Sequence, residues 1–203
     1  MSHSSVFFEI HKDIPIEGPG NFESTKKAFL TLSDLSAKPI ILDVGCGPGI
    51  QTIELTKLSN GDITALDLHQ DFLDELNKKA VAANLKSQIK TVQGSMLEMP
   101  FDKNSFDLVW SEGAIYIIGF KKGLQEWKGL LKDNGYLAVT HLSWLKKDIP
   151  EEPLKFWSEN YPDITSIDVN LEIGNKLGYQ VVDHFILPES AWWDHYYNPQ
   201  KNA

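Results

Sequence analysis

The sequence contains no arginine, so all 19 of its basic residues are lysines, and they are outnumbered by 28 acidic residues. The formal net charge is −9 at pH 7. A protein that binds DNA or RNA needs a basic face to neutralise phosphates, and arginine is the side chain that most often reads guanine. The composition therefore argues against a nucleic-acid substrate, and we predict no nucleic-acid partner.

Cysteine and long apolar runs are also scarce. Cys46 is the single cysteine, which excludes an intramolecular disulfide, and no apolar run has the length of a membrane span or a secretory leader. Histidine and cysteine lack the paired spacing of a metal site, so we predict no metal. We expect a cytoplasmic protein without a membrane partner, and 203 residues suffice for one domain with a sizeable core.

The most informative stretch that is present, IILDVGCGPGIQT, runs from Ile40 to Thr52. Its apolar start is typical of a buried parallel strand, while Gly45, Gly47 and Gly49 permit positive φ and close approach of the backbone to a ligand. The spacing is not the G-x-G-x-x-G of dinucleotide-binding folds, and no phosphate-binding lysine follows. The pattern predicts a strand, a ligand-holding turn and a helix.

A second strand candidate, DITALDL, ends near Asp67. An acid about 20 residues after a glycine loop lies at the tip of the second strand, where it can accept hydrogen bonds from ribose hydroxyls. The alternative is that Asp67 caps the next helix, but Asp71 is the better N-cap candidate. The loop and the acid together indicate a nucleoside-containing cofactor.

The D-x-G-x-G-x-G pattern from Asp43 to Gly49 resembles motif I of the class I S-adenosylmethionine-dependent methyltransferases. From Pro39 to Trp144, the order of glycine loop, ribose acid and fourth strand is similar to the small-molecule branch (methyltransferase type 11) related to the ubiquinone and sterol enzymes. The turn Ser111-Glu112-Gly113-Ala114 cannot replace the N-P-P-Y signature of DNA and glutamine methyltransferases. The resemblance implies S-adenosylmethionine as cofactor, S-adenosylhomocysteine as product and a small-molecule methyl acceptor.

The resemblance also implies a set of cofactor-binding residues at the ends of the predicted strands. Many relatives have an acid where this chain has Ser95, so a Ser95 hydroxyl or a backbone carbonyl would meet the adenine amino group, with Met96 against the ring or simply in the core. We interpret Cys46 as a packing residue of the loop. The implied set is Asp43, Gly45, Cys46, Gly47, Gly49, Asp67, Leu68, Gly94, Ser95, Met96, Ser111 and Glu112.

Methyl transfer from a sulfonium is an in-line displacement, so the protein mainly positions the acceptor behind the methyl group. An acceptor hydroxyl or ammonium needs a base, and Glu112 and His141 are the candidates because both end central strands. In the alternative, Glu112 only holds the cofactor and His141 is a satisfied core residue. Two other functions remain open: a non-catalytic S-adenosylmethionine-binding protein and, disfavoured by the glycine spacing and Asp43, a nicotinamide-dependent oxidoreductase.

The alternation of strand and helix patterns predicts an α/β fold, a Rossmann-like doubly wound and mostly parallel sheet with helices on both faces. We expect a single domain over 1–203, divided into an N-terminal lid and helix (1–38), a cofactor-binding core (39–144) and a C-terminal substrate-side region (145–203). Helices are predicted at 22–35, 50–58, 71–83, 120–131 and 167–177, and strands at 40–44, 62–68, 89–92, 106–110, 136–141 and 179–187.

The C-terminal region departs from the family pattern because no strand candidate follows Leu187. The last strand of the family's sheet is missing. Either the chain is truncated or the sheet is completed differently, for example by a second copy in a homodimer. The aromatic run at 192–197 is expected to cover exposed core or to close the pocket, with cover the favoured interpretation.

Overall fold

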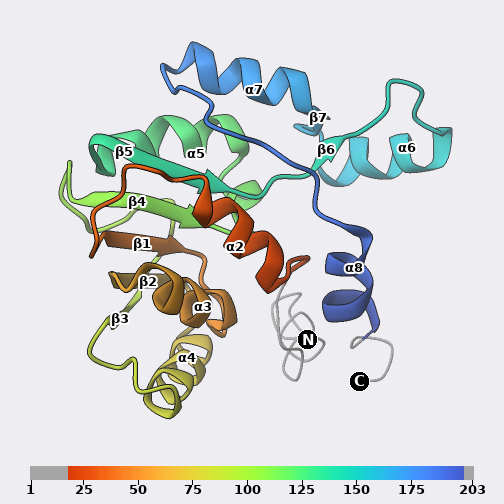
Figure 1. Ribbon diagram of the computed structural model, residues 1–203. Coiled ribbons are helices and arrows are strands. Elements are labelled where there is room, and N and C mark those ends of the chain that lie inside the picture. The colour runs from red at the N-terminus through yellow and green to blue at the C-terminus, as the bar shows by residue number, and fades with distance from the viewer. Residues whose placement is uncertain (1–17, 199–203) are drawn as a thin grey trace.

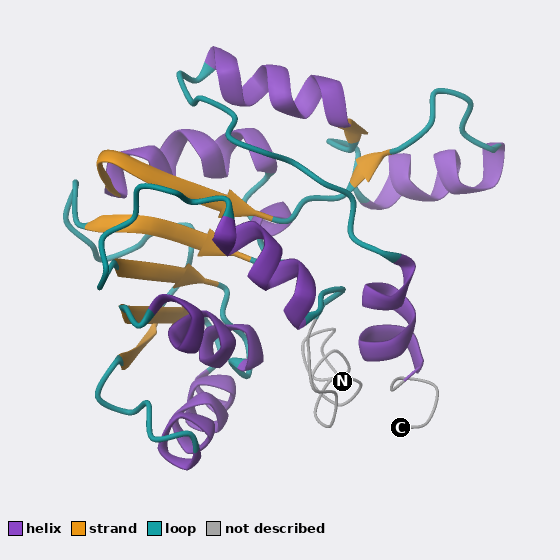
Figure 2. Ribbon diagram, viewed as in Figure 1, coloured by secondary structure: helices purple, strands orange, loops and turns teal. Residues whose placement is uncertain are grey.

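The computed structural model describes residues 18–198, so most of the predicted N-terminal lid lies outside the described residues. Its centre is a sheet of five parallel strands in the order β3-β2-β1-β4-β5 (Figure 1 and Figure 2). The strands are β1 (Ile40–Val44), β2 (Asp62–Asp67), β3 (Ile89–Gln93), β4 (Phe106–Ser111) and β5 (Leu131–Val139). This is the Rossmann-like α/β fold that the sequence predicts.

Helices cover both faces of this sheet because side chains of a strand point alternately to its two sides. On one face Ile41 and Leu108 pack with Leu55 of α3 and Phe29 of α2. On the other face the core is closed by Trp127 of α5. The helices are α2 (Phe22–Leu30), α3 (Ile50–Ser59), α4 (Gln70–Ala82) and α5 (Phe120–Trp127).

The chain beyond β5 leaves the sheet and forms smaller elements. A short parallel pair, β6 (Ser143–Trp144) and β7 (Thr165–Ser166), flanks α6 (Glu151–Asn160), which extends away from the sheet (Figure 1). Helix α7 (Ile167–Lys176) follows, and the chain returns to α8 (Glu189–Trp192) and a π-helical turn, Trp193–Tyr197. Two 3-10 turns, Ile115–Ile117 and Lys128–Leu130, flank α5.

Several predicted boundaries were wrong. Helix α2 begins after Asn21, whose side chain accepts a hydrogen bond from the Ser24 amide at 2.9 Å, but it ends at Leu30 instead of residue 35. Asp71 is not an N-cap, since α4 begins one residue earlier, after His69. The predicted helix at 120–131 ends at Trp127. The strand predicted at 136–141 is β5, which begins earlier, at Leu131, and ends at Val139.

The strand predicted at 179–187 was also wrong. This segment pairs with no strand among the described residues, and Val182 and Ile186 are exposed on it. Its β-branched and aromatic residues favour a strand, but a strand also needs a neighbour to pair with, and the described part of the chain provides none here. In residues 18–198, β5 therefore forms an edge of the sheet.

Candidate functional site

The glycine loop lies where the carboxyl ends of β1, β2 and β4 meet. Gly45, Gly47 and Gly49 have φ values of 72°, 52° and 82°, a region that favours glycine. A Cβ atom on Gly45 would lie 2.5 Å from Cβ of Ala114, and one on Gly49 would lie 2.3 Å from Cδ1 of Leu76. The loop thus needs glycine both for its backbone conformation and for its close packing.

Asp67, the predicted ribose-binding residue, fixes this loop to the tip of β2. Its Oδ2 accepts a hydrogen bond from the Gly47 amide and its Oδ1 accepts one from the His69 amide, both at 2.9 Å. The neighbouring Leu68 is 59% exposed. Because each carboxylate oxygen can accept a further hydrogen bond, Asp67 keeps the capacity to bind hydroxyl groups.

Asp43 lies beneath the loop and is buried. Its Oδ2 accepts a hydrogen bond of 2.6 Å from Oγ1 of Thr52, a residue of α3 that sequence reasoning missed. Burial raises the pKa of Asp43 to about 6; the Thr52 hydrogen bond opposes this rise and the charge of Asp67 adds to it. Asp43 therefore joins β1 to α3 inside the protein.

Cys46 and Met96 have packing positions next to the loop. Cys46 is buried in a cluster with Ile53 and Leu73, and burial raises the pKa of its thiol well above the ordinary value. Met96 packs against the core on the other face, and a Cβ atom on Gly45 would lie 3.4 Å from its Cε. The Cys46 thiol is therefore kept neutral, which fits its interpretation as a packing residue.

The loop after β3 is held by backbone and hydroxyl contacts. The amide of Gly94 donates to the carbonyl of Asp67 at 2.9 Å, and Oγ of Ser95 accepts from the Leu97 amide at 3.1 Å. The Ser95 hydroxyl is thus used within its own turn, although it retains a proton to donate. These contacts place the predicted adenine loop beside the tip of β2.

Glu112 follows β4 and is surrounded by polar partners. Its Oε1 accepts hydrogen bonds from Oγ1 of Thr25 at 2.8 Å and from Nε1 of Trp110 at 2.9 Å. Burial raises the pKa of Glu112 to about 7. Ser111, at the end of the strand, is fully buried and donates to the carbonyl of Val44, joining β4 to β1.

His141 lies two residues beyond β5 in an aromatic cluster. Its ring stacks on Phe120 with centroids 4.3 Å apart and meets the edge of Tyr161 at 5.8 Å. Neither ring nitrogen has a hydrogen-bond partner among residues 18–198, so the interpretation as a satisfied core histidine was wrong. Burial lowers the pKa of His141 to about 4, against the opposing charge of Asp163, and the imidazole is neutral at pH 7.

The ends of β4 and β5 are joined by a contact that no sequence pattern signals. The amide of Gly113 donates a hydrogen bond of 2.6 Å to Oγ1 of Thr140, the residue before His141. Thr25, Thr52 and Thr140 are all common residues in unremarkable positions of the sequence. Their roles depend on contacts between segments far apart in the chain.

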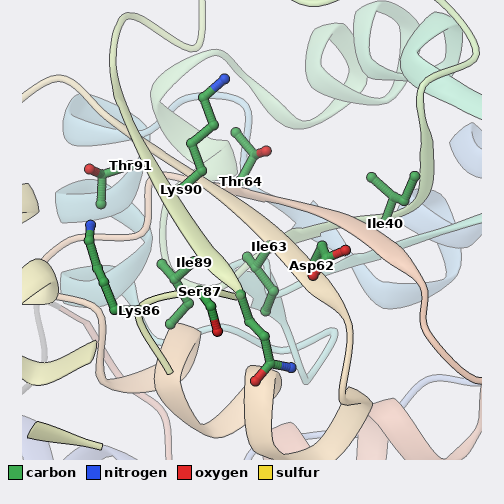
Figure 3. Close-up of a pocket in the computed structure, with 10 residues that line it drawn as sticks. Ile40, Asp62, Ile63, Thr64, Lys86, Ser87, Ile89, Lys90 and Thr91 are labelled. Atoms are coloured by element: carbon green, nitrogen blue, oxygen red, sulfur yellow. The ribbon is translucent and has the colours of Figure 1, made fainter. Parts of the chain in front are cut away.

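Other kinds of site find little support in the described part of the chain. No group of three or more histidine, cysteine or acidic side chains there could hold a metal ion, and no described helix is long and apolar enough to cross a membrane. A hollow of about 480 Å³ lies at the amino ends of β1 and β2, where Ile40, Asp62 and Lys86 line it (Figure 3). It is at the opposite end of these strands from the glycine loop.

Comparison with known proteins identifies the central part of the chain. Residues 41–135 match the family described as "Methyltransferase domain". The sterol 24-C-methyltransferase erg-4 of Neurospora crassa is 30% identical over 142 residues, which are 70% of this chain and 35% of the relative. The ubiquinone/menaquinone biosynthesis C-methyltransferase UbiE of Rickettsia bellii is 32% identical over 146 residues, 68% of this chain and 57% of the relative. The chain thus spans only about a third to just over half of these relatives.

Solved structures share the fold over nearly the whole chain. An S-adenosylmethionine-dependent methyltransferase from Thiobacillus denitrificans, crystallised with S-adenosylhomocysteine, superposes with a TM-score of 0.83 over 97% of this chain and 79% of that one, at 23% identity. A second, from Geobacter sulfurreducens, gives 0.81 over 95% and 77% at 16% identity. At these identities the likeness establishes the fold.

Proposed function

We propose that this chain, whose residues 41–135 match the family described as "Methyltransferase domain" and whose fold is shared by solved methyltransferases, belongs to that family and transfers a methyl group from S-adenosylmethionine to a small-molecule acceptor. The observation that carries the proposal is the glycine loop. Its three left-handed glycines are fixed to the tip of β2 by the hydrogen bond from Gly47 to Asp67. The hydrogen bond thus holds two features side by side: a turn whose backbone a ligand can approach closely, and an acid that can bind ribose hydroxyls.

The residues at the carboxyl ends of the strands fit such a cofactor. The close contacts at Gly45 and Gly49 leave no room for a side chain at these two positions. The carboxyl groups of Asp43, Asp67 and Glu112 suit the positive charge of a sulfonium and an ammonium. When bound, S-adenosylmethionine supplies an electrophilic methyl group. We assign its binding to the loop, to Asp67 and Leu68, to Gly94, Ser95 and Met96, and to Ser111 and Glu112.

For the acceptor we propose a small apolar molecule, because the named relatives are a sterol 24-C-methyltransferase and a C-methyltransferase of ubiquinone/menaquinone biosynthesis. His141 is the better candidate for a base, since both nitrogens of its neutral ring lack a partner in the described part of the chain, whereas Oε1 of Glu112 already accepts two hydrogen bonds. We further propose that the protein is a single cytoplasmic domain, is without nucleic-acid or membrane partners, and forms a homodimer.

The ribose assignment is tested by comparing two acids of the same chain. We expect Asp67→Ala to weaken S-adenosylmethionine binding at least tenfold, because Asp67 both positions the loop and accepts the ribose hydroxyls. The control is Asp71→Ala, which changes an exposed acid in the first turn of α4. Equal affinity of both variants in isothermal titration calorimetry would contradict the assignment.

A further inference from the structure

The side chain of Glu112 contacts several elements of the site, which a role as a proton acceptor alone does not explain. Its Oε1 accepts from Thr25 in the first turn of α2 and from Trp110 of β4. Its Oε2 would lie 3.4 Å from a Cβ atom on Gly20, and Nε2 of Gln51 in α3 would lie 3.5 Å from the same atom. The start of α2, the tip of β4 and the start of α3 thus meet around one carboxyl group.

Two further contacts hold residues 18–25 at the carboxyl end of the sheet. A Cβ atom on Gly18 would lie 3.7 Å from Cα of Gly113, the residue after Glu112. The amide of Gly20 donates to the carbonyl of Ala191 in α8 at 3.2 Å. Residues 18–25 are therefore held between the tip of β4 and the C-terminal helix, and Glu112 is the charged group at their centre.

No cation balances this charge within residues 18–198. The ion pairs there involve neither Glu112 nor Asp43. The charge of Asp43 in β1 raises the pKa of Glu112 in addition to the larger effect of burial. The groups that face Glu112 from α2, α3 and β4 are neutral. Two carboxyl groups without a counter-ion among residues 18–198 would be stabilised by a ligand that brings a positive charge.

We propose that Glu112 is a positioning residue that fixes the start of α2 to the tip of β4 and, through its charge, makes the cofactor site prefer the cationic S-adenosylmethionine over S-adenosylhomocysteine. The inference rests on the proposed function. Methyl transfer breaks the bond between sulfur and methyl carbon, and its electron pair stays on sulfur. The product is therefore a neutral thioether, so the preference for the cofactor also weakens product binding.

This preference depends on pH in a direction that the charges dictate. A positive ligand favours the ionised carboxylate, so binding of the cofactor releases a proton from Glu112, and affinity rises with pH. With a pKa of about 7 in the free protein, a group that is fully ionised in the complex makes binding about fourfold weaker at pH 6.5 than at pH 8.5. Asp43, with a pKa of about 6, contributes mainly below this interval.

The test is calorimetric titration of both ligands at pH 6.5 and 8.5 into wild type, Glu112→Gln and Glu23→Gln. The glutamine carbonyl can still accept from Thr25 and Trp110, so the first variant removes charge and keeps the contacts. Glu23 is an exposed acid in the first turn of α2 and provides the matched control. Titration of the cofactor's own amino group is common to all three proteins and cancels in the comparison.

We expect Glu112→Gln to lose the fourfold pH dependence. We also expect its ratio of S-adenosylmethionine affinity to S-adenosylhomocysteine affinity to fall at least fivefold, while Glu23→Gln retains both properties. A Glu112→Gln protein with the wild-type pH dependence and ligand ratio would overturn the charge role. If wild type binds neither ligand at either pH, the proposed function fails instead.

The positioning role has a test that needs no ligand. We expect Glu112→Ala, which removes the acceptor of the Thr25 hydroxyl, to accelerate amide hydrogen exchange in α2 at least tenfold relative to Glu23→Ala. Exchange in the distant α4 should stay unchanged in both, which shows that the variants are folded. Equal protection of α2 in the two variants would overturn the positioning role.

Discussion

At the scale of single residues, the hydrogen bond from Thr52 to Asp43 is the contact that makes an acid tolerable beneath the glycine loop. We expect Thr52→Val to lower the free energy of unfolding by about 1–3 kcal/mol at pH 8, where Asp43 is ionised and loses its donor. The loss should shrink at pH 5, below the pKa of about 6, because the protonated carboxyl is less costly to bury. Urea denaturation at both pH values measures it.

The control for this change is Thr56→Val. The Thr56 hydroxyl is equally buried and donates to the carbonyl of Thr52, which is neutral at every pH. Its loss should cost about 1 kcal/mol at both pH values. If the loss of stability caused by Thr52→Val is also the same at pH 5 and pH 8, Asp43 is not the group that Thr52 stabilises.

Two glycines provide a second prediction at this scale. Gly49→Ala should destabilise the protein by about 3 kcal/mol or more, because its φ is 82° and the added Cβ atom would overlap Leu76. Gly174→Ala in α7 should be neutral or stabilise by up to about 1 kcal/mol, since nothing lies within 4 Å of the added atom. Thermal unfolding of both variants measures these changes. A Gly49→Ala protein with the stability of the wild type would contradict the packing of the loop.

The conformation of the glycine loop and the placement of Asp43 and Asp67 beside it could be predicted from the sequence, because they belong to local patterns with a physical meaning. The partners Thr25, Thr52 and Thr140 could not, since each acts on a segment brought near only by the fold. The sequence likewise suggested Glu112 as a base or cofactor ligand without revealing its contact with α2.

At the scale of elements, α6 differs from the helices that cover the sheet. None of its ten residues is buried, and Leu154 and Phe156 are exposed on it. Helix α3 has the same length and five buried residues. We expect amide hydrogens of α6 to exchange at least a hundredfold faster than those of α3, because local opening of α6 exposes little new apolar surface. Equal protection of the two helices would show that a partner covers α6.

The strands of the core were predictable because buried parallel strands read as short apolar runs. The end of α5 was not, since residues 120–131 keep a helical apolar pattern although Leu131 pairs with Phe106 in the sheet. The segment 179–187 shows the reverse error. Its sequence favours extended backbone, but sheet formation also needs a neighbouring strand, which local sequence cannot report.

At the scale of the whole molecule, β5 is an edge strand among the described residues, and apolar side chains such as Val182, Ile186 and Trp193 are exposed. If a second copy covers these surfaces, as we propose, the melting temperature rises with protein concentration by mass action. We expect this rise between micromolar and hundred-micromolar protein in calorimetric scans. A cooperative thermal transition whose midpoint does not depend on protein concentration would exclude completion of the sheet by a second copy of the chain.

The central claim concerns the cofactor, and its most direct test is calorimetric titration of S-adenosylmethionine, S-adenosylhomocysteine and NADH into the 203-residue chain. The glycine spacing, the loop geometry and the fold all predict micromolar binding of the two adenosyl ligands and no binding of NADH. Preferential binding of NADH, or binding of none of the three by a folded chain, would contradict the account.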